Sequence, residues 1–238
     1  MLRLKPEKWL NDDIINFYFA LLAKRDYDLC LSDGKKKRSH FYNTQFMTQL
    51  RNEDEGGNDK FDDDDENYKF GNVKRWTKTI PGGDVFALDK LFIPINITNT
   101  HWACVTVFMD EKIIEYYDSI RGRSGLKYTK AVLRYLKDLD QSSQIRQQLS
   151  YWEEWELVDV DDSPKQNNSF DCGVFVCMIA DCLGLDQPLT FTQEHINHCR
   201  QRIALAILNG CVPTLDNPVG GVKDQDEIKK GNKRSLTL

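Results

Sequence analysis

Residues 172–183 read Cys-Gly-Val-Phe-Val-Cys-Met-Ile-Ala-Asp-Cys-Leu. As a helix, this segment carries apolar side chains around nearly its whole circumference, with Asp181 as the one charged interruption. A helix that is apolar on all sides is buried among other elements rather than laid on a surface. The segment is also too short to cross a membrane. It therefore predicts a central helix of a globular domain, beginning at Cys172.

Short apolar runs lie on the N-terminal side of this helix. Residues 91–97, 102–108, 113–117 and 155–160 are rich in β-branched and aromatic side chains, so they predict strands of one sheet, some buried on both faces. Helical periodicity precedes and follows them. It marks residues 12–22 after Asn11 as N-cap, a short helix capped at Asn43 or Thr44, a helix around 132–139, and one from Thr190 or Thr192 to Gly210. This order of elements predicts an α+β domain with a mixed central sheet and flanking helices.

The chain has 238 residues, 40% of them hydrophobic and 29% charged, which fits one globular domain. We place that domain at residues 1–212. Residues 52–68 are acidic and glycine-containing with little to bury, so they predict a disordered surface insertion. Residues 213–238 are polar and predict a loose C-terminal tail.

Charge and cysteine usage exclude several classes of protein. Residues 53–66 hold nine acidic residues against one lysine, so the net charge of −5 comes from this stretch and the remaining chain is mildly basic, without a nucleic-acid footprint. Seven cysteines without a paired spacing predict reduced thiols.

The first residues carry charge and no apolar signal segment follows them, which argues against secretion. The basic run from Lys35 to Arg38 is a candidate nuclear localisation signal, although a solvated loop is the simpler interpretation.

Three chemically active residues stand at the ends of predicted elements. His101 precedes one strand, Asp118 follows the next, and Cys172 begins the buried helix. The positive end of a helix and a neighbouring imidazolium both favour a thiolate, and a carboxylate bonded to the far ring nitrogen holds the imidazole in the useful tautomer. Gln166, six residues before Cys172, can supply an amide to an oxyanion beside the Cys172 N–H. The pattern predicts a thiol nucleophile with a histidine base.

The order of short motifs along the chain resembles the SUMO (sentrin)-specific cysteine proteases, the ubiquitin-like-protein protease family of the adenain-like clan. The motifs are Trp9-Leu10-Asn11-Asp12, Val73-Lys74-Arg75-Trp76-Thr77, His101-Trp102, Tyr117-Asp118-Ser119, Gln166 followed by Asp171-Cys172-Gly173-Val174-Phe175, Asp181-Cys182 and Phe191-Thr192-Gln193. The resemblance covers roughly residues 1–211, and the full ordered set is highly specific. The acidic insertion is the main departure from the family, and it puts no catalytic residue in doubt.

The resemblance implies a papain-like cysteine protease fold and a triad of His101, Asp118 and Cys172, with Gln166 in the oxyanion hole. It also implies that Trp9 and Trp102 wall a narrow tunnel over the C-terminal Gly-Gly of the modifier, where only glycine avoids a clash. Taken alone, the two tryptophans would be read as core aromatics. Asp12 would lie at the interface with the modifier.

The implied activity is that of a thiol isopeptidase that cleaves after the Gly-Gly of SUMO, releasing it from substrate lysines and maturing its precursor. SUMO and SUMO-conjugated proteins are the implied partners. We expect a monomer that needs no cofactor or metal, binds no nucleic acid and does not insert into membranes. The family and the basic run together imply nuclear residence, with a cytoplasmic pool as an alternative.

Other interpretations remain open from the residues themselves. The same chemistry could act on another ubiquitin-like modifier, a Cys–His pair could pass an acetyl group to an acceptor other than water, and the chain could bind a modifier without cleaving it. His195, His198 and Cys199 lie close in sequence, but adjacent residues of one helix point apart and no fourth ligand is evident, which argues against zinc.

Overall fold

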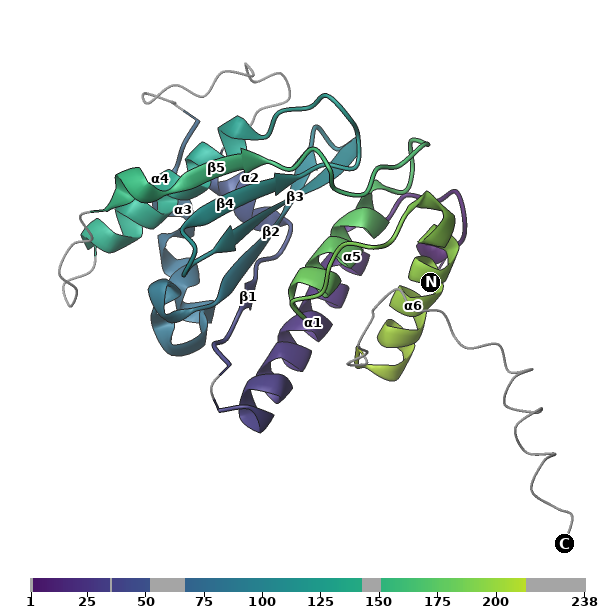
Figure 1. The fold of residues 1–238 in the computed structure, drawn as a ribbon, viewed down its shortest axis with the longest axis horizontal. Coiled ribbons are helices and arrows are strands. Elements are labelled where there is room, and N and C mark those ends of the chain that lie inside the picture. The colour runs from purple at the N-terminus through teal and green to yellow at the C-terminus, as the bar shows by residue number, and fades with distance from the viewer. Residues whose placement is uncertain (1, 35, 52–66, 143–150, 213–238) are drawn as a thin grey trace, which may run out of the picture.

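The computed structural model describes residues 2–34, 36–51, 67–142 and 151–212 (Figure 1). Most of the acidic insertion, Lys35 and the C-terminal tail therefore lie outside the described residues, and the predictions made for them stay predictions. Among the described residues, no helix combines the length and the apolar character needed to cross a membrane.

A five-stranded mixed sheet forms the centre of the domain. Its strands are β1 (His40–Phe41), β2 (Lys90–Ile97), β3 (His101–Phe108), β4 (Ile113–Tyr117) and β5 (Glu156–Asp159), and they lie in that order. The two outer pairs, β1 with β2 and β4 with β5, are parallel, whereas β2 with β3 and β3 with β4 are antiparallel. The predicted strands and the mixed sheet are confirmed. The two-residue strand β1 was not predicted, because two residues are too few to display a periodicity.

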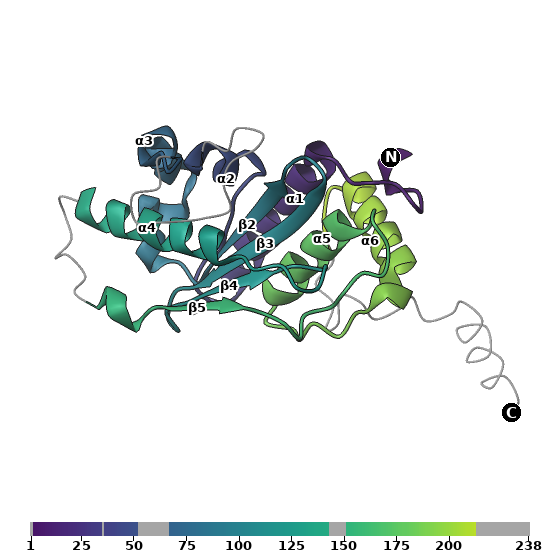
Figure 2. The ribbon, with the colours of Figure 1, turned by 90° about the horizontal axis from the view of Figure 1, so that it is seen from above.

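Helices cover both faces of this sheet (Figures 1 and 2). On one face lie α1 (Asp12–Ser32), α5 (Cys172–Leu183) and α6 (Ile196–Asn209), and on the other lie α2 (Gln45–Leu50), α3 (Phe70–Val73) and α4 (Leu126–Ser142). Short 3-10 helices are found at Leu2–Leu4, Lys74–Thr79, Pro81–Gly83, Val85–Ala87, Trp152–Glu154 and Gln193–His195. The bounds of α5 match the prediction, and the α+β class is confirmed.

The sheet separates two hydrophobic cores. Successive side chains of a strand point to opposite faces, so Phe92, Trp102 and Cys104 enter the core shared with α1, α5 and α6, which we call the α5 core. Ile93 and Val105 enter the other, shared with α2 and α4, which we call the α4 core. Strands buried on both faces read as continuous apolar runs, which is why β2 and β3 lack polar alternation.

The charged interruption of the central helix ties three helices together. Asp181 is fully buried, and its carboxylate accepts hydrogen bonds from Arg25 Nη1 of α1 at 2.5 Å, from Arg202 Nε of α6 at 2.8 Å and from the Tyr18 hydroxyl at 2.7 Å. A buried carboxylate is tolerated only when it is paired and hydrogen-bonded in this way. Asp181 therefore fixes the mutual register of α1, α5 and α6.

The helix caps differ in detail from the prediction. Asn11 occupies the N-cap position of α1, but its Nδ2 donates to the side chain of Asp13 rather than capping the helix. At α2 the Oδ1 of Asn43 accepts from the backbone N–H of Gln45, so Asn43 takes the capping role in preference to Thr44. Before α6, Thr192 caps a 3-10 turn.

Candidate active site

His101 and Asp118 face each other from neighbouring antiparallel strands. A turn closed by the Thr100 N–H on the Ile97 carbonyl, with Thr98 and Asn99 at positive φ, places His101 at the first position of β3. Asp118 directly follows the last residue of β4. The His101 Nε2 lies 2.7 Å from the Asp118 Oδ1, and both side chains are buried. The sequence placed these two residues at strand ends, and the sheet brings them together.

Asp118 is held by more than the histidine. Its Oδ1 also accepts the backbone N–H of Ile120 at 2.7 Å, and its Oδ2 accepts the Tyr116 hydroxyl at 2.9 Å. Burial alone would raise the pKa of Asp118, but the hydrogen bonds from His101, Ile120 and Tyr116 outweigh it and hold that pKa below its ordinary value. The carboxylate is therefore ionised and fixed in orientation.

Cys172 completes the cluster at the first residue of α5. Burial lowers the pKa of His101, but hydrogen bonds to Asp118 and to Cys172 outweigh this effect and raise the pKa to about 9. With Nε2 turned to Asp118, Nδ1 is the ring nitrogen left for the thiol. A charged imidazole beside a sulfur nucleophile at a helix N-terminus is the arrangement that activates a thiolate for attack on a carbonyl.

Gln166 is fixed beside these residues by three hydrogen bonds. Its Oε1 accepts the Ser119 hydroxyl at 2.7 Å, its Nε2 donates to the carbonyl of Asn168 at 2.5 Å, and its backbone N–H donates to the carbonyl of Ser119 at 2.9 Å. An amide nitrogen carries two hydrogens, so one remains for an oxyanion. The N–H of Cys172 stands in the first turn of α5, where backbone donors have no intrahelical acceptor.

The two tryptophans differ in exposure. Trp9 is 38% exposed, whereas Trp102 is 5% exposed and its indole N–H donates to the carbonyl of Leu10 at 3.1 Å. Leu10 also packs on Gly173, since a Cβ added at Gly173 would lie 2.9 Å from the Leu10 Cβ. The Trp9–Leu10 segment therefore lies over the start of α5. Trp102 combines the expected position beside His101 with a place in the α5 core.

Asp12 lies at the first turn of α1, partly exposed, where its carboxylate accepts the Gln45 side-chain amide at 3.3 Å.

The residues that hold the triad in place were not identified from the sequence. Tyr116 is two residues before Asp118 and so shares its face of the strand, a signal that could have been used. Ser119 carried no comparable signal, because its bond to Gln166 joins segments 47 residues apart.

Within the described ranges, no three His, Cys, Asp or Glu side chains are gathered as a metal site requires. His195 instead accepts the backbone N–H of Thr192 through its Nδ1 and completes the cap before α6.

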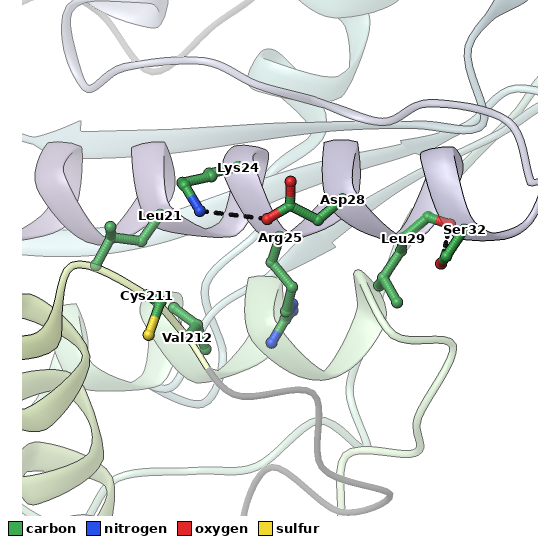
Figure 3. Close-up of a pocket in the computed structure, with 8 residues that line it drawn as sticks. All are labelled: Leu21, Lys24, Arg25, Asp28, Leu29, Ser32, Cys211 and Val212. Atoms are coloured by element: carbon green, nitrogen blue, oxygen red, sulfur yellow. Dashed lines mark hydrogen bonds and ion pairs between the residues drawn. The ribbon is translucent and has the colours of Figure 1, made fainter.

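A hollow of about 350 Å³ lies between α1 and the residues that follow α6, lined among others by Arg25, Cys211 and Val212 (Figure 3). None of the candidate site residues lines it. A second hollow, of about 320 Å³, borders Asp118.

Comparisons with known proteins concern the domain as a whole. The profile of the Ulp1 protease family, C-terminal catalytic domain, matches residues 8–212. Ubiquitin-like-specific protease 1A of Arabidopsis thaliana is 36% identical over 207 residues, which cover 86% of this chain and 38% of that protein. Sentrin-specific protease 5 of Homo sapiens is 32% identical over 200 residues, which cover 84% of this chain and 22% of that protein. The chain spans less than two-fifths of the length of these curated relatives.

Among solved structures, the C-terminal Ulp1 protease domain in complex with Smt3, the yeast ortholog of SUMO, is similar to this chain with a TM-score of 0.65. The two are 26% identical, and the match covers 87% of this chain and 79% of the other. These similarities confirm the resemblance that the motifs indicate, and the five-stranded mixed sheet with its buried helix is consistent with a papain-like fold.

Proposed function

Because this chain belongs to the Ulp1 protease family, we propose that it is a thiol isopeptidase that cleaves after the C-terminal Gly-Gly of SUMO. It releases SUMO from substrate lysines and processes the SUMO precursor. The observation that carries the proposal is the buried His101–Asp118 pair, whose Nε2 to Oδ1 distance is 2.7 Å, set against Cys172 at the start of α5. Similarity to relatives named sentrin-specific proteases, and to a protease domain in complex with Smt3, supports SUMO as the partner.

The proposed reaction proceeds through a thioester. The sulfur of Cys172 attacks the carbonyl carbon of the terminal glycine, and the oxyanion that forms accepts hydrogen bonds from the Gln166 side chain and the Cys172 N–H. Protonated His101 gives its proton to the departing lysine amine. His101 then takes a proton from water, which attacks the thioester and releases the SUMO carboxylate and the thiol. Asp118 holds the imidazole in position throughout.

Trp9 and Trp102 are proposed to enclose the Gly-Gly, with Asp12 at the surface that contacts SUMO. Two observations support this: the indole of Trp102 is anchored on the carbonyl of Leu10, and the adjacent Trp9 is partly exposed and so accessible to a substrate. A side chain larger than hydrogen in the tunnel would clash, so specificity for glycine rests on sterics. We assign the reaction to a monomer that requires no cofactor or metal, with residues 1–212 as the catalytic domain.

The test uses C-terminal electrophile probes built on SUMO, ubiquitin and a Nedd-type modifier. We expect a SUMO adduct on Cys172, located by mass spectrometry, that is absent from Cys172→Ala. An adduct with another modifier alone would keep the mechanism and overturn the substrate. Folded protein that binds SUMO but forms no adduct would indicate a binding module, and transfer from acetyl-CoA without peptidase activity would indicate an acetyltransferase.

Nuclear residence is proposed from the family alone. Three side chains of the basic run form ion pairs. The Nζ of Lys36 lies 3.5 Å from the Asp186 Oδ2, and the Nζ of Lys37 lies 2.6 Å from the Asp110 Oδ1. The Nε of Arg38 lies 3.0 Å from the Oδ2 of the buried Asp26. These ion pairs engage three of the four basic side chains within the domain, so they argue for a structural role of the run. Replacing Lys36 and Lys37 by glutamine should leave the cellular distribution of a fluorescently tagged protein unchanged, and a shift to the cytoplasm would restore the run as a localisation signal.

A further inference from the structure

Arg200 is a buried arginine of α6 whose guanidinium reaches two segments of the active site. It is 2% exposed, and it donates to the Asp171 Oδ1 through Nε at 3.1 Å and through Nη2 at 2.5 Å. Asp171 immediately precedes Cys172. The same guanidinium donates to backbone carbonyls of the N-terminal segment: those of Lys8 at 2.7 Å, Lys5 at 3.1 Å and Arg3 at 3.4 Å.

The bonds to the N-terminal segment end one residue before Trp9. Leu10, the residue after Trp9, accepts the indole N–H of Trp102 through its carbonyl at 3.1 Å, and it packs on Gly173. Residues 3–10 are therefore pinned at one end by Arg200 and at the other by Trp102. Trp9, the exposed wall of the proposed tunnel, lies between Lys8 and Leu10, the two residues held by these bonds.

The bonds to Asp171 lead to the oxyanion glutamine. The other oxygen of Asp171 accepts the side-chain amides of Asn168 at 2.7 Å and Gln193 at 2.8 Å. The carbonyl of Asn168 in turn accepts Nε2 of Gln166 at 2.5 Å. A continuous set of hydrogen bonds thus joins Arg200, through Asp171 and Asn168, to the amide that is to meet the oxyanion.

We propose that Arg200 is a positioning residue for the reaction inferred above, on which this proposal rests: one guanidinium sets the Trp9–Leu10 segment and the loop 166–171 in place relative to Cys172. The planar fork of arginine presents five donors in fixed directions. The structure uses them on the Asp171 carboxylate and the Phe170 carbonyl, the latter at 3.4 Å, and at the same time on the carbonyls of the N-terminal segment. A lysine keeps the charge but offers three donors from a single point, so it cannot reproduce this set.

Arg202 provides a matched control on the same helix. It is two residues further along α6, and it is paired at 2.8 Å with Asp181 in the last turn of α5, away from Cys172. Arg200→Lys and Arg202→Lys make the same chemical change in an ion pair with a buried aspartate, which directly precedes Cys172 in the first case and lies in the last turn of α5 in the second.

The experiment compares two reactions of Cys172 in the parent and in both variants. One is steady-state cleavage of SUMO fused through Gly-Gly to a reporter, and the other is alkylation by iodoacetamide. Alkylation requires the nucleophilic sulfur, but it forms no tetrahedral oxyanion and does not thread a tunnel. For Arg200→Lys we expect kcat/KM for cleavage to fall roughly 10²-fold, the scale of a lost oxyanion donor or of a misplaced reacting group. The alkylation rate should change less than about threefold, within the ordinary context-dependence of a single contact.

Arg202→Lys should leave both reactions near the parent. Urea unfolding establishes that each variant is folded before assay. If Arg200→Lys does not fold, Gln193→Ala is used, because Gln193 is only partly buried and supports Asp171 from outside. We expect it to lower kcat roughly 10-fold, again with alkylation retained, since it removes one of several supports of the oxyanion loop.

Four outcomes overturn the inference. Cleavage that is unchanged in folded Arg200→Lys, or reduced equally in Arg202→Lys, leaves Arg200 with a structural role only. Alkylation that falls together with cleavage places the defect at the nucleophile itself. A parent that does not cleave SUMO overturns the proposed function and this inference with it, whereas a parent that cleaves with an insensitive Arg200 overturns the inference alone.

Discussion

Replacing Gly125 by alanine should destabilise the domain and weaken the site through the Tyr116 ring. Gly125 precedes α4, and a Cβ built on it would lie 1.9 Å from Cγ of Tyr116 and 2.3 Å from both Cδ atoms. Carbon atoms pack at about 3.5–4.0 Å, so the ring must move by more than an ångström. It has little room, because it is buried and stacks on Tyr128 with ring centroids 6.0 Å apart.

The expected cost has two parts. Overpacking a buried site costs about 1–3 kcal/mol, and loss of the hydrogen bond from the Tyr116 hydroxyl to the ionised Asp118 costs about 1.5–3 kcal/mol. The sum, roughly 2.5–6 kcal/mol, is a large share of the roughly 5–15 kcal/mol by which domains are stable. It corresponds to a fall in Tm of roughly 5–24 °C for a domain of this size. Cleavage should weaken as well, since Asp118 loses a support.

The assay is urea and thermal unfolding, with Gly71→Ala as the control. Gly71 lies in α3, and in the part of the chain that the structure describes no atom beyond its own helix and neighbours lies within 4 Å of the added Cβ, so that variant should stay within about 0.5 kcal/mol of the parent or gain slightly from helix propensity. Truncating the ring removes the clash, so Gly125→Ala should cost far less in a Tyr116→Ala background, by at least about 1 kcal/mol of coupling. Strictly additive costs, or a Gly125→Ala variant as stable as the parent, would refute the reasoning.

Three further predictions follow from the charged groups. Asp118→Asn should lower kcat roughly 10³-fold, as expected when the orienting carboxylate of a triad is lost, and should bring the pKa of His101 down from about 9, seen in the pH dependence of alkylation. Because the pKa of His101 is raised, its contribution to the free energy of unfolding is complete below its ordinary pKa of 6.5 and is lost as the pH rises through about 9. Because the pKa of Asp118 is lowered, its contribution is present above its ordinary pKa of 3.8 and is lost as the pH falls. The free energies of unfolding of the parent and of Asp118→Asn should therefore converge at both pH extremes. Asp181→Asn should cost about 3–5 kcal/mol in urea unfolding because Arg25 and Arg202 lose the buried carboxylate charge that pairs with them, while the alkylation rate of Cys172 in the folded variant stays near that of the parent.

Periodicity predicted the central helix, and the ends of elements made His101, Asp118 and Cys172 candidates that the family resemblance then joined into a triad. The helix at 172–183 is apolar on every side, so its burial follows from composition alone. The positions of His101 and Asp118 at strand ends follow from where the apolar runs start and stop. Their convergence required the antiparallel pairing of β3 and β4, which the short connection between those runs favours.

The supports of the site were not predictable in the same way. Arg200 contacts Lys8 across 192 residues of sequence, and no local pattern signals a bond of that range. The 3-10 turns between 74 and 87 carry no periodicity of 3.6 or 2, so they were not predicted either. Asn11 and Asn43 show the limit of capping rules, because both residues mark a helix start, but Asn11 donates its amide to Asp13 whereas Asn43 accepts a backbone N–H of the helix.

The division of the domain into two cores limits where a more heat-tolerant variant could be engineered. Cys172 and Trp102 belong to the α5 core, while Tyr116, which holds Asp118, belongs to the α4 core. Repacking either interior would therefore shift one partner of the triad against the others, and stabilising changes often lower activity in this way. The outer face of α6, where Leu205 is 55% exposed and Leu208 is 66% exposed, belongs to neither core, so polar substitutions there are the safer starting point for a stabilised enzyme.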